Sequence, residues 1–244
     1  GGKFLRLDLH LARLASGLEA LRIDLDVDVV RSLHHEILDR NKLTDADRAM
    51  VYIQVTRGAA PRTHAFPEPP VPPTVYLFAR KLKIRDLQRW EAGYAAITYP
   101  DLRWSRADLK TTGLLPNVLA QQAAVEAGVD DVILVRDGVA LEGSHANLFT
   151  ARNGQLETAP LDHRILPGIT RTLVIELAAE LGIQVREAAC PEKDLASADE
   201  VFLCGTTTEI RPLVKIDGAP VADGRVGPVS RRLYAALQDL TRRL

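Results

Sequence analysis

The chain has 244 residues, of which 46% are hydrophobic and 26% charged, a composition typical of a folded globular protein rather than a disordered chain. Its 31 basic and 32 acidic residues give a formal charge of −1, which excludes a chain-wide basic surface for nucleic acid or anionic membranes. Cys190 and Cys204 lack metal or redox spacing and no apolar run could span a bilayer, so we expect a cytoplasmic protein.

The first third of the chain predicts two helices followed by two strands. Leucines at helical spacing indicate a helix over residues 7–21, with Asp8 in its first turn, and a second helix is expected over 29–38. Segments rich in β-branched and aromatic residues predict strands at 51–57 and 74–79. The proline-rich run between these strands predicts an extended connector.

The remainder of the chain alternates between strand and helix patterns. Gly128 and Gly182 each follow a predicted helix, where a residue tolerant of positive φ is favoured. A mixed α/β fold is therefore predicted, with a small N-terminal α/β domain (1–82), a linker (83–85) and a larger domain (86–244). The predicted strands are 94–99, 132–135, 147–151 and 201–204, and the predicted helices are 117–127, 170–181 and 230–244.

Lys110 is a candidate catalytic amine. It follows a stretch containing Arg103 and Arg106, and cations that converged on it would depress its pKa. A single lysine is more often a solvated surface charge, so this stretch does not decide the matter by itself.

Two segments are candidate anion sites. Gly168, Ile169 and Thr170 precede an apolar helix, where backbone N–H groups and a hydroxyl could meet a phosphate. The alternative is an ordinary helix-capping threonine. Gly205, Thr206 and Thr207 follow a predicted strand and offer further amides and hydroxyls, with an ordinary polar turn as the alternative.

Two further segments carry charged side chains. Glu142 precedes a strand that we expect to be buried, so its carboxylate needs a partner; the protonated nitrogen of a pyridine cofactor or an arginine would serve. Arg62 and His64 share a loop whose guanidinium could clamp a carboxylate, although a solvated basic loop is the simpler interpretation. No histidine spacing indicates a metal site.

Taken together, these segments resemble the fold-type IV pyridoxal-phosphate enzymes, a group that includes D-amino-acid aminotransferases, branched-chain aminotransferases and aminodeoxychorismate lyase. The resemblance extends over almost the whole chain. It is carried, in order, by segments 10–14, 54–64, 108–110 and 142–144 with Asn147 and Phe149, then 168–171 and 206–207.

The resemblance implies pyridoxal 5'-phosphate as cofactor, two domains with a β-barrel-like core in the larger one, and a role for each matching residue. Lys110 would be the catalytic Schiff-base lysine, and Arg62 and His64 would bind the substrate carboxylate. Other residues would contact the cofactor, with Glu142 at its pyridine nitrogen: Arg13, Leu166, Gly168, Ile169, Thr170, Gly205, Thr206 and Thr207.

The loop carrying Arg62 and His64 resembles that of the D-amino-acid enzymes, in which the neighbouring subunit contributes it, so a homodimer is implied. The expected reaction is transamination between D-alanine and 2-oxoglutarate. A branched-chain L-amino-acid aminotransferase, an aminodeoxychorismate lyase and a defective cofactor-binding protein are the alternatives. Relatives begin with further strands, so we expect this sequence to lack an N-terminal segment.

Overall fold

The computed structural model describes residues 3–83 and 86–244, and the chain divides into two compact units at this gap. Two residues of the predicted linker, 84 and 85, lie outside the described residues. Within the described ranges, no helix combines the length and the apolar character needed to cross a membrane.

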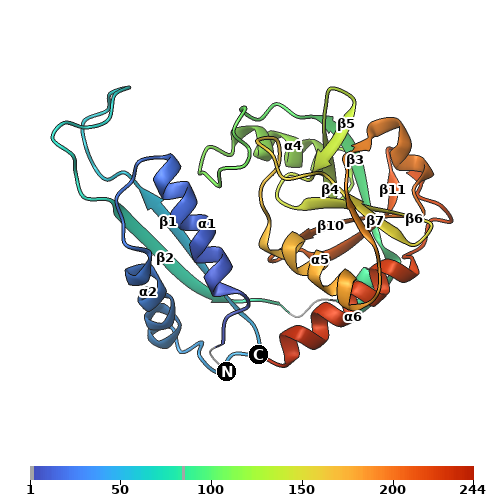
Figure 1. Cartoon of the computed structure of the whole chain (residues 1–244), viewed down its shortest axis with the longest axis horizontal. Coiled ribbons are helices and arrows are strands. Elements are labelled where there is room, and N and C mark those ends of the chain that lie inside the picture. The colour runs from blue at the N-terminus through green and yellow to red at the C-terminus, as the bar shows by residue number, and fades with distance from the viewer. Residues whose placement is uncertain (1–2, 84–85) are drawn as a thin grey trace. The chain divides into compact units, whose positions relative to one another are not determined.

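The first unit contains the two helices and two strands predicted for it (Figure 1). Helix α2 packs against α1 and against both strands of an antiparallel ribbon. The side chain of Asp26 caps α2 by accepting a hydrogen bond from the Asp28 amide at 2.9 Å. The elements are α1 (Leu7–Ala20), α2 (Val27–Arg40), β1 (Ala49–Thr56) and β2 (Thr74–Lys81).

The connection between β1 and β2 contains the proline-rich run, and residues 57–73 form neither helix nor strand, as the prolines predicted. Arg57 secures the start of this loop. Its guanidinium donates to the carbonyl oxygens of Leu21 and Arg22 and lies 3.5 Å above the ring centre of Phe66. Arg57 is thus a structural residue of the first unit.

The second unit is built on ten strands, six of which form a closed ring. Following the hydrogen-bonded neighbours gives β6, β10, β11, β3, β4 and β5, and the pairing of Glu142 with Asn147 joins β5 back to β6. The β-barrel-like core implied by the resemblance is therefore confirmed. The strands are β3 (Tyr94–Pro100), β4 (Asp131–Arg136), β5 (Val139–Glu142), β6 (Asn147–Arg152), β7 (Gln155–Thr158), β8 (Val185–Glu187), β9 (Cys190–Pro191), β10 (Glu200–Gly205), β11 (Glu209–Ile216) and β12 (Ala219–Pro220).

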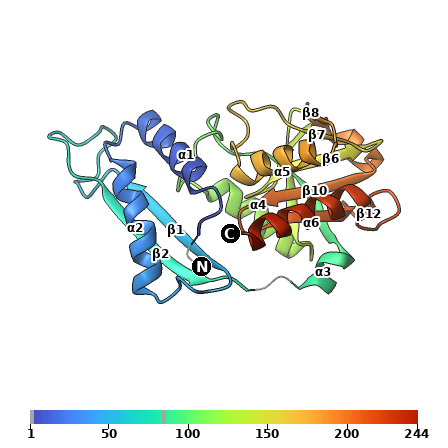
Figure 2. The same ribbon diagram turned by 60° about the horizontal axis from the view of Figure 1, so that its bottom comes forward.

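Apolar side chains fill the barrel, and helices pack on its outside. The rings of Phe149 and Phe202, on the paired strands β6 and β10, stack with centroids 5.1 Å apart. Figure 2 shows α5 and α6 lying along the face that carries β10, while α4 packs on β3 and β4. The helices are α3 (Leu87–Ala92), α4 (Leu115–Glu126), α5 (Ile169–Glu180) and α6 (Pro228–Arg242), with a 3-10 turn at Glu192–Ser197.

Every helix and strand predicted for this unit is present, and several further elements were not predicted. Gly128 and Gly182 have φ values of 69°, as expected for residues that end helices. The unpredicted elements are α3, β5, β7, β8, β9, β11, β12 and the 3-10 turn.

Candidate active site

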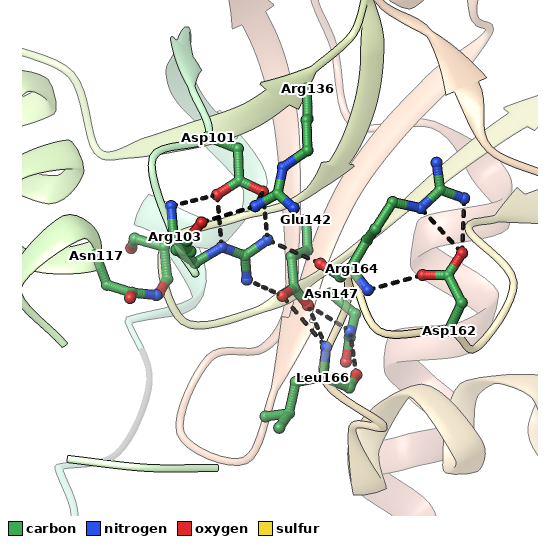
Figure 3. Close-up of polar contacts among 10 residues, drawn as sticks. Asp101, Arg103, Asn117, Arg136, Glu142, Asn147, Asp162, Arg164 and Leu166 are labelled. Carbon is green, nitrogen blue, oxygen red and sulfur yellow. Dashed lines mark hydrogen bonds and ion pairs between the residues drawn. The ribbon is translucent and has the colours of Figure 1, made fainter. Parts of the chain in front are cut away.

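Glu142, the last residue of β5, is the centre of a buried polar network (Figure 3). Its carboxylate accepts hydrogen bonds from the guanidinium of Arg103, from Nδ2 of Asn147 at 2.9 Å and from the backbone amide of Leu166 at 3.2 and 3.3 Å. The structure thus brings together Glu142 and Leu166, which are 24 residues apart in the sequence and were both predicted to contact the cofactor.

Arg103 lies between the carboxylates of Asp101 and Glu142. It bonds Asp101 through Nε at 2.8 Å and Nη2 at 2.9 Å, and Nη2 also donates to the Arg164 carbonyl at 3.0 Å. The arginine considered as an alternative partner of Glu142 is therefore present. Although burial acts to raise the pKa of Asp101, its hydrogen bonds with Arg103 outweigh that effect and lower the pKa.

Burial raises the pKa of Glu142 to about 7, although Arg103 and the Leu166 amide both favour the ionised form. The bonds from Arg103 and Leu166 thus do not fully offset the cost of removing the carboxylate from water. A further cation beside it would stabilise its charge. A protonated ring nitrogen is such a cation. The buried carboxylate therefore fits the pyridine cofactor that the sequence implies, even with Arg103 in place.

Asn147 connects Glu142 to the start of α5. Its Nδ2 donates to the Leu166 carbonyl at 2.9 Å as well as to Glu142. Its Oδ1 lies so close to Gly168 that a Cβ atom there would be 1.9 Å away. The absence of a side chain at Gly168 allows α5 to begin beside the buried carboxylate.

Helix α5 begins at Ile169, with Gly168 as its N-cap residue. The interpretation of Thr170 as an N-capping threonine is wrong, because Thr170 is already the second helical residue. The first N–H groups of a helix have no acceptor within it and carry the positive end of the helix dipole. Ile169 and Thr170 thus present an end of α5 whose chemistry fits a phosphate group.

The second candidate anion segment lies at the end of β10. Residues 206–208 form a turn, as the alternative interpretation proposed, and Glu209 follows with a φ of 56°. A Cβ atom on Gly205 would lie 3.4 Å from the carbonyl oxygen of His145, in the turn after Glu142. Gly205 is therefore beside the turn that connects β5 to β6, and Thr206 and Thr207 follow it directly in the sequence.

Lys110 lies in the segment between β3 and α4, and its side chain is exposed. This segment and the helix after it are attached near Glu142: Arg103 bonds Glu142 itself, and Nδ2 of Asn117 in α4 donates to the Ser144 carbonyl at 2.7 Å. The two arginines of this segment, Arg103 and Arg106, are each paired with carboxylates, the latter with Asp108.

Three predicted site residues belong to the first unit. Arg13 on α1 is partly buried, and this loss of water lowers the pKa of its guanidinium. Arg62 and His64 are exposed in the loop between β1 and β2. Their relation to Lys110 and Glu142 stays a prediction.

Comparisons with known proteins address the chain as a whole. The D-alanine aminotransferase of Bacillus licheniformis is 37% identical over 241 residues, covering 98% of this chain and 83% of that protein. The D-alanine aminotransferase of Staphylococcus epidermidis is 36% identical, covering 97% of this chain and 83% of its own length.

Solved branched-chain aminotransferases share the fold. The Escherichia coli enzyme superposes with a TM-score of 0.86 at 29% identity, covering 95% of this chain and 78% of that one. The Thermobaculum terrenum enzyme in its PLP-form gives a TM-score of 0.81 at 26% identity, covering 97% and 78%. Residues 1–216 match the family model of amino-transferase class IV. The chain therefore belongs to the class IV aminotransferases, enzymes that use pyridoxal 5'-phosphate.

Proposed function

We propose that the protein transfers the amino group of a D-amino acid to a 2-oxo acid, with D-alanine and 2-oxoglutarate as substrates and pyruvate and D-glutamate as products. The observation that carries this proposal is the similarity to D-alanine aminotransferases over 98% of the chain. The loop bearing Arg62 and His64 supports it, because the sequence there resembles the D-amino-acid enzymes.

Lys110 holds the cofactor covalently in this proposal. Once free, the Lys110 amine at Nζ would accept the proton from the substrate Cα and would later give this proton up again, so that Lys110 ends the transfer unchanged. The exposure of Lys110 supports this role, since the side chain must reach a small molecule and be released from it.

The bound cofactor supplies an electron-withdrawing ring that makes the substrate Cα proton acidic. Glu142 keeps the ring nitrogen protonated, and Arg103 and Asn147 hold the Glu142 carboxylate in position. The remaining predicted residues bind the cofactor, chiefly at its phosphate: Arg13, Leu166, Gly168, Ile169, Thr170, Gly205, Thr206 and Thr207.

Arg62 and His64 bind the substrate carboxylate. The guanidinium offers two parallel N–H donors and the imidazole a third, which suits a carboxylate on a small substrate. We further propose that this loop acts in a neighbouring subunit, so that the active form is a homodimer.

A branched-chain L-amino-acid aminotransferase is the second candidate. The observation in its favour is the TM-score of 0.86 to the Escherichia coli branched-chain enzyme. The two candidates use the same cofactor residues and differ in how they bind the substrate.

The visible absorption spectrum of the cofactor-loaded protein separates these candidates. Addition of D-alanine should abolish the band of the lysine-bound cofactor near neutral pH, and L-leucine should leave it unchanged. A response to L-leucine alone would favour the branched-chain activity. No band after addition of pyridoxal phosphate would contradict the assignment of Lys110.

A further inference from the structure

A chain of hydrogen bonds runs from α4 to His145, in the turn between β5 and β6. Gln121 donates through Nε2 to the Asp130 carbonyl at 3.1 Å, which fixes the orientation of its amide. Its Oε1 accepts from the Ser144 hydroxyl at 2.7 Å. The Ser144 oxygen in turn lies 2.8 Å from Nδ1 of His145.

This chain fixes the tautomer of the His145 ring. The single proton of the Ser144 hydroxyl is used in the bond to Gln121, so the hydroxyl can only accept a hydrogen bond from His145. Nδ1 must then carry the ring proton, and Nε2 of the neutral ring has a free lone pair. The network thus leaves one hydrogen-bond acceptor on His145.

The position of His145 makes that acceptor accessible. In the stretch 141–150, His145 is the one exposed residue, and all of its neighbours in sequence are buried. The turn that carries it is attached through Glu142 to Arg103, in the segment containing Lys110, and through the Ser144 carbonyl to Asn117, in the helix α4 that follows this segment. The segment that carries Lys110 is therefore anchored beside the turn that carries His145, and the Lys110 charge is among those that act on the His145 ring.

Loss of water, together with the charges around the ring, keeps the ring neutral. The surrounding protein desolvates the ring and lowers the pKa of His145; Asp131 opposes this, while Arg211 and Lys110 lower the pKa further. Asp131 on β4 is itself paired with Arg211 on β11 at 2.6 Å, so it offers little help to a second cation. The ring is thus a hydrogen-bond acceptor, not a cation, at neutral pH.

We propose that His145 is a positioning residue for Lys110: through the lone pair of Nε2 it accepts a hydrogen bond from the Lys110 amine and orients that amine toward the substrate Cα. No covalent bond changes in this step. Protonation of the ring at low pH converts Nε2 into a donor and places a cation beside Lys110, so the interaction is lost. The inference rests on the proposed role of Lys110.

The first test is nitrogen-15 NMR of the histidine rings in the cofactor-free protein. His145 should show a protonated Nδ1 and an unprotonated Nε2, and Ser144→Ala should produce a mixture of tautomers. Lys110→Ala should raise the pKa of His145, because a neighbouring cation is removed. A protonated Nε2, or an unchanged titration in Lys110→Ala, would overturn the proposal.

The second test compares substitutions at His145. The side-chain oxygen of His145→Gln can replace the Nε2 acceptor, so this variant should keep most of kcat, while His145→Leu should lose about tenfold in kcat with little change in KM. The acid limb of the pH profile should disappear in His145→Gln. His163→Gln, at an exposed histidine of the same unit, is the control. Equal kcat losses in His145→Leu and His145→Gln would contradict a positioning role.

Borohydride reduction of the cofactor-loaded protein, followed by mass spectrometry, tests the proposed function separately from the role of His145. Attachment of the cofactor to another lysine would contradict the proposed function itself. Attachment to Lys110 together with an unchanged His145 titration would contradict only the role of His145.

Discussion

Oδ1 of Asn147 and the α-carbon of Gly168 are in such close approach that a Cβ atom at position 168 would lie 1.9 Å from that oxygen. The backbone of Gly168 has an ordinary φ of −74°, so the glycine is required by the neighbouring side chain and not by backbone conformation. Because Asn147 also donates to Glu142, this contact helps to set the spacing between α5 and the buried carboxylate.

Gly168→Ala should therefore destabilise the protein by about 1–3 kcal/mol and weaken cofactor binding, because Asn147 must move away from Glu142. Urea unfolding and titration with pyridoxal phosphate measure the two effects. Gly17→Ala is the control, since Gly17 lies within α1 with no atom within 4 Å of an added Cβ. Unchanged cofactor affinity in Gly168→Ala would show that the position of Asn147 is unimportant for binding.

Lys110→Ala should abolish turnover while leaving the fold intact, because the amine proposed to hold the cofactor and move the proton is removed. Activity and far-ultraviolet circular dichroism are the measurements. Lys193→Ala, at an exposed lysine of the 3-10 turn, should retain full activity. Normal turnover in Lys110→Ala would refute the assigned role.

Arg103→Met should lower the free energy of unfolding by about 3–5 kcal/mol, since it leaves the buried carboxylates of Asp101 and Glu142 without their shared partner. Arg106→Met removes a similar bond to Asp108 from the same segment, but that pair is far more open to solvent and its loss should matter much less. Urea unfolding of the cofactor-free variants compares the two. Equal losses would mean that burial does not determine the contribution of Arg103.

Glu142→Gln should change how stability depends on pH. The folded-state pKa of Glu142 is about 7 against an ordinary value of 4.5, so between these pH values the folded protein binds more protons than the unfolded chain. The titration of Glu142 should therefore lower the free energy of unfolding of the wild-type protein as the pH rises from about 4.5 to about 7, by at most about 3 kcal/mol.

The Glu142→Gln variant lacks this titration. Its free energy of unfolding, relative to that of the wild type, should therefore increase as the pH rises across that interval. Urea unfolding of the cofactor-free proteins at several pH values gives the two slopes. Parallel slopes would mean that Glu142 titrates as an ordinary glutamate.

Regular periodicity made the longer elements predictable. In α2, Val30, His34 and Leu38 are buried at four-residue spacing, and the sequence shows this pattern directly. Strand β11 was not predicted because Arg211 and Pro212 interrupt its apolar pattern. Strand β5 has only four residues, too few to show a period.

The partners within the candidate site were less accessible to prediction. Glu142 was recognised as a carboxylate in need of a partner, but Arg103 is 39 residues away and nothing in the sequence distinguishes it from Arg106. The pairing depends on the order of the strands, in which β4 lies between β3 and β5 and pairs with both. Such contacts are properties of the folded chain and not of any local pattern.

The pairing of Glu142 with Asn147 that joins β5 to β6 has a consequence for redesign. The same two residues complete the ring of strands and form the buried polar network, so the barrel seam cannot be varied without disturbing both. The loop of residues 57–73 is exposed over most of its length and is secured by Arg57. Libraries that build on the substrate role proposed for Arg62 and His64 should therefore randomise positions in this loop and keep the seam constant.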